Sequence, residues 1–169
     1  RPTACSATTA LLSDDRFHNL GVPASPDFLS SPNKQITFRF EQASNGVPRK
    51  LYESARDDFG LYYVTKRPGD IGKFRTASLR ELKHTASYMH NGVFNDLKTV
   101  VLFYDKYNNP SAKRQINPET GQPWDKPEVA ANLSTKELKT GPGLDDKRIN
   151  ALVAFLRTLT DKRYEPLLK

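Results

Sequence analysis

Apolar side chains recur at helical spacing shortly after residue 96. The members of this stripe are Leu97, Val100, Val101, Tyr104 and Tyr107. They follow the i, i+3, i+4, i+7 steps of a single helix face, and Asn95 or Asp96 can cap the first turn. The spacing therefore predicts a helix that begins near Asp96 and turns Tyr104 inward.

A second apolar stripe predicts a helix over about residues 145–159. Its members are Ile149, Leu152, Val153, Leu156 and Leu159. Asp145 and Asp146 stand where a helix N-terminus favours carboxylates. A stripe of this kind normally packs against a hydrophobic core, so we expect this helix to be a packing element.

The remaining segments have weaker patterns. Residues 13–35 are rich in Asp, Pro, Ser and Asn, which predicts an extended loop. Residues 54–66 predict a short helix with Phe59 and Tyr62 on its apolar side. Five prolines within residues 108–144 predict a long irregular excursion. The expected fold is therefore mostly α-helical with long irregular loops.

Size and charge narrow the function classes. A chain of 169 residues is one ordinary domain, and its formal net charge is +7. The basic residues form no block and no nucleic-acid motif, so we expect a solvated basic surface, with an acidic redox protein as the alternative partner. No apolar run is long enough for a transmembrane helix. A single cysteine excludes an internal disulfide framework.

Four motifs gather residues that are able to bind a cofactor or carry protons. The motifs are RFHNLGVP at 16–23, GKFRTASLR at 72–80, TASYMHNG at 85–92 and VVLFY at 100–104. The planar guanidinium group of arginine can pair with a carboxylate, the imidazole of histidine can carry protons, and the phenol of tyrosine can bind a metal. Together they indicate a site for an anionic or metal-containing cofactor.

In order and spacing, these motifs and the closing helix resemble the C-terminal haem half of the bacterial dihaem cytochrome c peroxidase and MauG (methylamine utilisation) family. The resemblance covers nearly the whole chain. It implies that residues 1–169 form one cytochrome c-like haem domain, and that the N-terminal haem domain is absent or is another chain. It also implies a periplasmic protein, because haem c is attached there.

The resemblance assigns roles near the iron. It puts Tyr104 at the axial-ligand position, where the peroxidases carry methionine and MauG-like relatives carry tyrosine. A phenolate favours ferric iron and lowers the haem potential. A core tyrosine with a hydrogen-bonded hydroxyl is the alternative, and Met89 is then the fallback ligand. His90 serves the haem pocket or is a satisfied buried histidine, and His18 braces the loop backbone near the haem.

The resemblance also suggests which residues hold the haem propionates and a calcium ion. It places Arg75 and Arg80 beside the haem propionates, although ordinary surface ion pairs are the alternative. Thr85 and Ser87 match positions whose backbone carbonyls bind calcium in the family, and carbonyl oxygens suit this ion.

The haem attachment motif is incomplete. Haem c is held by a Cys-x-x-Cys-His run, whereas residues 5–15 read CSATTALLSDD. A Cys-His pair between Ala7 and Thr8 would restore the family pattern. We therefore expect haem attachment near Cys5, with a bare buried or reactive thiol as the alternative.

Three functions follow from these observations. The first is a haem c redox domain that relays electrons or oxidising equivalents between a peroxide-activating haem and a partner protein. The second is an electron-transfer cytochrome c subunit of a larger complex. The third is a haem-less scaffold descendant of the fold, which the missing Cys-His pair favours.

Overall fold

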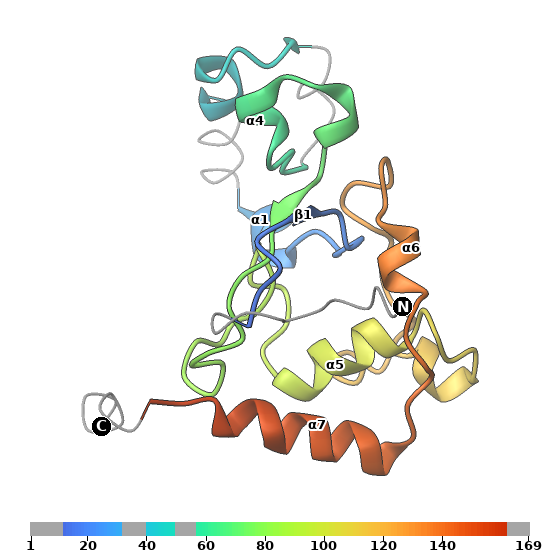
Figure 1. The fold of residues 1–169 in the computed structure, drawn as a ribbon. Coiled ribbons are helices and arrows are strands. Elements are labelled where there is room, and N and C mark those ends of the chain that lie inside the picture. Colours follow the sequence, from blue (N-terminus) through green and yellow to red (C-terminus); the bar gives the residue numbers. More distant parts are fainter. Residues whose placement is uncertain (1–11, 32–39, 50–56, 162–169) are drawn as a thin grey trace. The chain divides into compact units, whose positions relative to one another are not determined.

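Helices make up most of the regular structure in the computed structural model, which describes residues 12–31, 40–49 and 57–161 (Figure 1). In chain order, the elements are β1 (Phe17–His18), α1 (Pro26–Ser30), α4 (Tyr62–Thr65), the 3-10 helix η1 (Pro68–Asp70), β2 (Phe74–Arg75), α5 (Leu97–Asp105), the 3-10 helix η2 (Ala112–Gln115), α6 (Thr135–Leu138) and α7 (Asp146–Thr158). The expectation of a mostly helical fold is confirmed.

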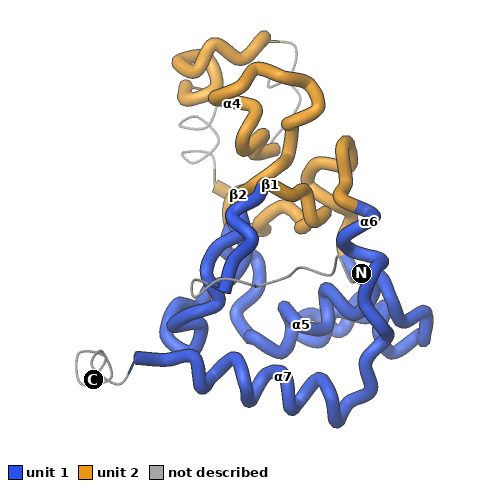
Figure 2. The backbone as a smooth tube through the Cα atoms, viewed as in Figure 1, with its two compact units in different colours: residues 1–16, 76–124, 135–169 blue, residues 17–75, 125–134 orange. Residues whose placement is uncertain are grey.

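The chain forms two compact units, which interleave along the sequence (Figure 2). Unit 1 comprises residues 1–16, 76–124 and 135–169. Unit 2 comprises residues 17–75 and 125–134. A single cytochrome c-like domain over residues 1–169 stays a prediction.

Unit 1 is built on the packing of α5 against α7. The buried residues of this core are Leu97, Val101 and Leu102 from α5 and Ile149, Val153 and Leu156 from α7. Asp145 caps α7, because its side chain accepts the backbone N–H of Arg148 at 2.7 Å. Both helices that the apolar stripes predicted are therefore present, with ends close to the expected ones.

The segment just before α5 is held by a side chain from a distant part of the chain. Asp96 occupies the N-cap position but its side chain makes no capping bond. Instead, the Glu119 carboxylate accepts the backbone N–H of Asp96 at 2.9 Å and that of Asn95 at 3.1 Å. A carboxylate from the loop after η2 thus holds the backbone that leads into α5, and the local side-chain cap that the sequence predicts is not formed.

The prediction that Tyr104 faces inward is wrong, because its side chain is 39% exposed. The buried arc of α5 runs from Leu97 and Val101 on the α7 side to Phe103 on the other side. Phe103 is fully buried against Phe94 and Trp124. This second contact rotates the buried arc away from Tyr104.

Unit 2 joins two of the sequence motifs in a short antiparallel ribbon. β1 pairs with β2 so that Phe17 faces Arg75 and His18 faces Phe74. Asn19, which is 4% exposed, fastens the next segment, since its side-chain amide donates to the carbonyls of Val129 at 3.0 Å and Ala131 at 2.7 Å. The segment 13–35 therefore contains more regular structure than the predicted loop.

A small core fills unit 2 near α4. Val47, Phe59 and Tyr62 are buried together. Gly60 has a φ of +55°, and a Cβ there would lie 2.3 Å from the carbonyl oxygen of Lys73. Only glycine allows this close approach, which brings the start of the α4 turn against the residue before β2. The predicted helix over 54–66 is reduced to α4, and residues 50–56 lie outside the described part of the chain.

Candidate functional site

Most of the predicted site residues of unit 1 lie on the loop between β2 and α5. Arg80, Thr85, Ser87 and His90 are all exposed there. The loop is held by internal bonds, since the Tyr88 N–H donates to the carbonyl of Phe94 at 2.7 Å and its hydroxyl donates to the carbonyl of Leu82 at 2.6 Å. These bonds give the loop a defined course around its predicted site residues.

Glu81 ties the same loop to the end of α7. Its backbone N–H donates to the carbonyl of Leu159 at 3.0 Å, and its carboxylate accepts the N–H of Asp161 at 2.6 Å. Arg80 is the neighbouring residue in the chain, so this two-point attachment fixes the backbone from which the Arg80 side chain extends.

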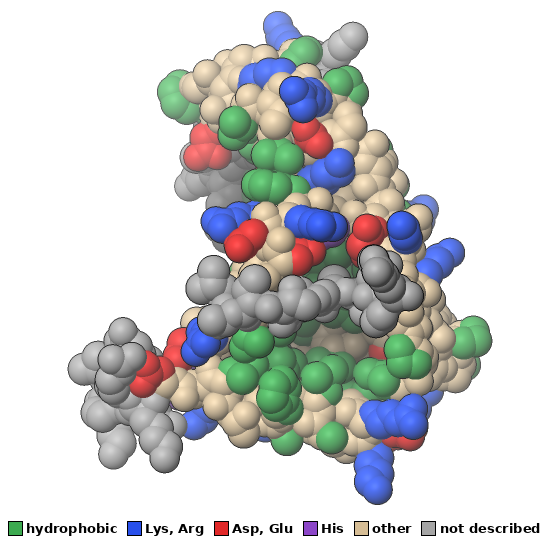
Figure 3. All heavy atoms as spheres, in the orientation of Figure 1, with side chains coloured by type: hydrophobic (Ala, Val, Ile, Leu, Met, Phe, Trp, Pro, Cys, Tyr) green, Lys and Arg blue, Asp and Glu red, His purple; other side chains and the backbone are tan. Residues whose placement is uncertain are grey.

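Part of the surface of unit 1 is apolar. Figure 3 shows hydrophobic side chains gathered over α5 and α7, with a hollow among them. Tyr104, Leu152 and Phe155 are large apolar side chains in this unit that remain 39%, 37% and 53% exposed. Exposed aromatic and aliphatic side chains of this kind suit the lining of a flat, mostly apolar cofactor.

The other predicted site residues belong elsewhere. His18 and Arg75 occupy adjacent strands of the ribbon in unit 2 but are not paired, since His18 lies opposite Phe74 and Arg75 lies opposite Phe17. Cys5 lies outside the described part of the chain. Among the described residues, no three His, Cys, Asp or Glu side chains are grouped so that they could hold a metal ion.

An aromatic cluster adjoins Tyr104 on α5. The Phe103 ring lies 6.0 Å from the Tyr104 ring, 5.9 Å from the Tyr107 ring and 5.5 Å from the Trp124 ring, centroid to centroid. The Lys106 ammonium stands over this cluster, 4.1 Å from the Phe103 centroid. Burial lowers the pKa of Lys106 to about 8, and burial raises the pKa of Tyr107.

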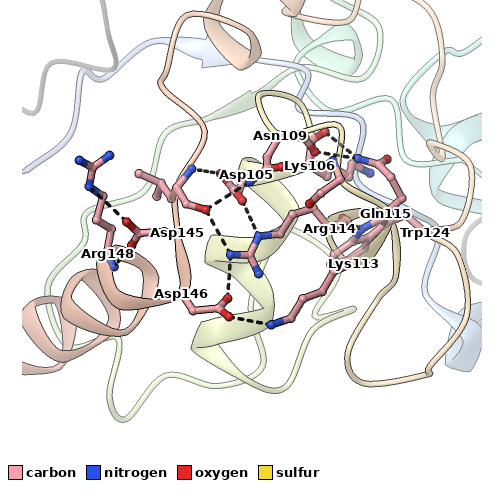
Figure 4. Close-up of polar contacts among 12 residues, drawn as sticks. Asp105, Lys106, Asn109, Lys113, Arg114, Gln115, Trp124, Asp145, Asp146 and Arg148 are labelled. Atoms are coloured by element: carbon pink, nitrogen blue, oxygen red, sulfur yellow. Dashed lines mark hydrogen bonds and ion pairs between the residues drawn. The ribbon is translucent and has the colours of Figure 1, made fainter.

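A buried ion pair follows directly after Tyr104 in the chain (Figure 4). The Asp105 carboxylate lies 2.9 Å from Nε of Arg114, and the two side chains are 0% and 6% exposed. Asp105 also accepts the N–H of Leu144 at 2.7 Å, and Arg114 donates to the carbonyl of Leu144 at 3.1 Å. The pair therefore joins the C-terminus of α5 to the segment that leads into α7.

Asp146 extends the pair to the surface. Its carboxylate lies 2.8 Å from Nη2 of Arg114 and 2.6 Å from Nζ of Lys113. Hydrogen bonds from Lys113 and Arg114 lower the pKa of Asp146 to about 2. The network thus holds the first turn of α7 at the end of α5, and with it the backbone of Tyr104.

Sequence reasoning missed this network and the lysine above the aromatic cluster. Arg114 stands in the proline-rich stretch and Asp146 lies 32 residues later at the start of α7, and no local pattern pairs them. The available signal was Asp105 itself, a carboxylate at a position that the helix pattern places next to core residues. A buried carboxylate needs a cationic partner, so its position indicated that one should exist.

Comparisons with known proteins agree with the motif order. No family model matches the chain. Methylamine utilization protein MauG of Paracoccus denitrificans (strain Pd 1222) is 50% identical over 77% of this chain and 36% of its own length. Cytochrome-c peroxidase IdrP2 of Pseudomonas sp. (strain SCT) is 50% identical over 88% of this chain and 33% of its own length.

A solved structure shares the fold. The crystal structure of a MauG-like protein associated with microbial copper homeostasis matches 95% of this chain and 43% of that chain, with a TM-score of 0.57 and 24% identity. No helix in the described residues is long and apolar enough to cross a membrane. The chain spans about a third of the length of the MauG and IdrP2 relatives. With half of its residues identical to theirs over most of its length, the chain belongs to the family of MauG and the dihaem cytochrome c peroxidases.

Proposed function

We propose that this chain forms the C-terminal haem c domain of a dihaem peroxidase or MauG-like oxidoreductase. In this role, it relays electrons or oxidising equivalents between a peroxide-activating haem and a partner protein. The observation that carries the proposal is 50% identity to MauG and to a cytochrome-c peroxidase over 77% and 88% of the chain. The motif order of the sequence supports it.

The described residues fit a haem. Tyr104 offers a phenol oxygen from an exposed position on α5, and Leu152 and Phe155 offer apolar contact on the same unit. Haem iron, when bound, supplies one-electron and peroxide chemistry. When haem is bound, the phenolate of Tyr104 would hold the iron and favour its ferric state, and Cys5 would provide the covalent attachment.

Charged residues orient the cofactor in this proposal. The guanidinium groups of Arg75 and Arg80 bind the propionates, and His18 braces the backbone near the ring edge. The exposed imidazole of His90 moves a proton between the pocket and water. The carbonyls of Thr85 and Ser87 bind calcium, which is completed by ligands from the companion haem domain.

Partner and compartment follow from the same family assignment. The companion is an N-terminal haem domain in the same protein or a separate haem chain. The formal net charge of +7 favours an acidic protein as the redox partner. Attachment of haem c places the protein in the periplasm. A haem-less scaffold is the second candidate, because the Cys-His pair that normally follows Ala7 is missing.

The test is a comparison of absorbance and mass. The chain is produced with haem c maturation factors, extracted with acidic acetone, and examined for a Soret band and for intact mass. If haem is covalently attached, the extracted chain still shows the Soret band and the added mass of haem. The Cys5→Ser variant should lose both, and the control Ser6→Ala should retain both. A bare polypeptide mass without Soret absorbance would exclude the haem domain and favour the scaffold.

A further inference from the structure

A lysine ammonium lies over three aromatic rings at the end of α5. Nζ of Lys106 is 4.1 Å from the centroid of Phe103, 4.9 Å from that of Tyr107 and 5.1 Å from that of Trp124. Each ring face attracts the cation through its quadrupole, and three faces around one ammonium make a strong site for a positive charge. The charge therefore has a fixed place within the cluster.

The same cluster connects Tyr104 with the single tryptophan of the chain. The Phe103 ring contacts the Tyr104 ring at 6.0 Å and the Trp124 ring at 5.5 Å. Packed rings at these separations offer a short route for electrons. An oxidant close to Tyr104 is thus only two ring contacts away from Trp124, whose indole can give up one electron before it loses a proton.

The surroundings of Trp124 oppose its oxidation in two ways. Removal of an electron leaves a positive indole, and a second positive charge 5.1 Å away raises its free energy. At an effective dielectric constant of about 20, this repulsion changes the equilibrium constant by roughly two orders of magnitude. The indole N–H donates to the backbone carbonyl of Arg114 at 2.8 Å, and a carbonyl is not a base that would take the proton.

We propose that Lys106 protects Trp124 and Tyr107 from one-electron oxidation, and so keeps oxidising equivalents near Tyr104 out of this cluster. The opposed step transfers one electron from the Trp124 indole to the oxidant, which is thereby reduced by one electron. The indole radical cation then loses its Nε1 proton to water. This protective role goes beyond the proposed haem function.

The test uses the haem-free chain, so its outcome is independent of whether haem binds. Azidyl radicals generated by pulse radiolysis take one electron from indole and become azide. Trp124 is the only tryptophan, so the indole radical signal and the oxidised tryptic peptide both report on it alone. At a pH below neutrality, Lys106→Met is expected to speed Trp124 oxidation by roughly threefold to tenfold.

Control variants separate charge from packing. Lys98→Met removes an exposed lysine from the same helix and should leave the rate unchanged. Lys106→Arg keeps the charge and should stay close to the wild-type rate, and Lys106→Gln should behave like Lys106→Met if the methionine disturbs folding. Acrylamide quenching of Trp124 fluorescence checks that its exposure is constant. Wild-type rates in both neutral variants, or an Arg variant as fast as Lys106→Met, would overturn the proposal.

Discussion

The buried ion pair between Asp105 and Arg114 makes a quantitative prediction about stability. In Arg114→Met, a side chain of similar length fills the space, but the Asp105 carboxylate stays at 0% exposure without its cation. Removing one partner of a buried pair costs about 3–5 kcal/mol, because the remaining charge is desolvated and uncompensated. We expect the free energy of unfolding to fall by that amount.

Lys113→Met is the matched control. It removes an ion pair to Asp146 whose side chains are 72% and 57% exposed, so it should cost only about 0–1 kcal/mol. Adding Asp105→Asn to Arg114→Met removes the buried charge and should recover part of the loss. A double-mutant cycle over these variants gives the coupling free energy directly.

The assay is urea unfolding followed by far-UV circular dichroism and by fluorescence. The single tryptophan is a suitable probe, because the indole of Trp124 donates to the backbone carbonyl of Arg114 itself. The urea concentration at the unfolding midpoint should shift, while the slope of the unfolding free energy against urea concentration stays constant, as expected for a change in stability alone. The reasoning is refuted if Arg114→Met destabilises the chain no more than Lys113→Met.

Further predictions concern the ligand, the companion haem domain, acid stability and one glycine. Tyr104→Phe should leave haem attached but change its spin state and raise its potential; an identical spectrum and potential would show that Tyr104 does not bind iron. The isolated chain should turn over peroxide far below a typical ~10 per second, and addition of an N-terminal haem domain should restore activity in a steady-state assay. The pKa of Asp146 is lowered to about 2 by its two cationic partners, so its contribution to stability is present above the ordinary aspartate pKa and is lost as the pH falls through about 2. Urea midpoints across pH should therefore show Asp146→Asn less stable than wild type near neutrality and equal to it in strong acid; a constant difference would contradict this. Gly60→Ala should lower the free energy of unfolding by at least about 1 kcal/mol more than Gly46→Ala does. Both positions have positive φ, but only at Gly60 would the added Cβ meet a backbone oxygen, at 2.3 Å. Equal urea midpoints for the two variants would contradict this clash.

The two long helices could be predicted because their causes are local. Apolar spacing placed α5 and α7 within a few residues of their observed bounds, and Asp145 is the cap that its position indicated. The orientation of α5 could not be obtained in this way. It depends on the packing of Phe103 against Phe94 and Trp124, which is a tertiary contact that cannot be read from the spacing of apolar residues along the helix.

Long-range polar contacts were also beyond local reasoning. Asn19 bonds to carbonyls more than a hundred residues later, at Val129 and Ala131. Arg114 reaches both Asp105 and Asp146 from a stretch that reads as irregular. Motif order predicts Tyr104 as a site residue, but it contains no sign of the lysine over the adjacent rings. Such contacts arise from the course of loops, for which the sequence pattern is weakest.

The interleaving of the two units sets the order in which the chain can acquire its structure during synthesis. The core of unit 1 needs Ile149, Val153 and Leu156, so α5 leaves the ribosome long before its packing partner is made. A nine-residue helix is marginal in water by itself. Unit 1 therefore stays open until α7 emerges from the ribosome, whereas all residues of unit 2 are made before that point.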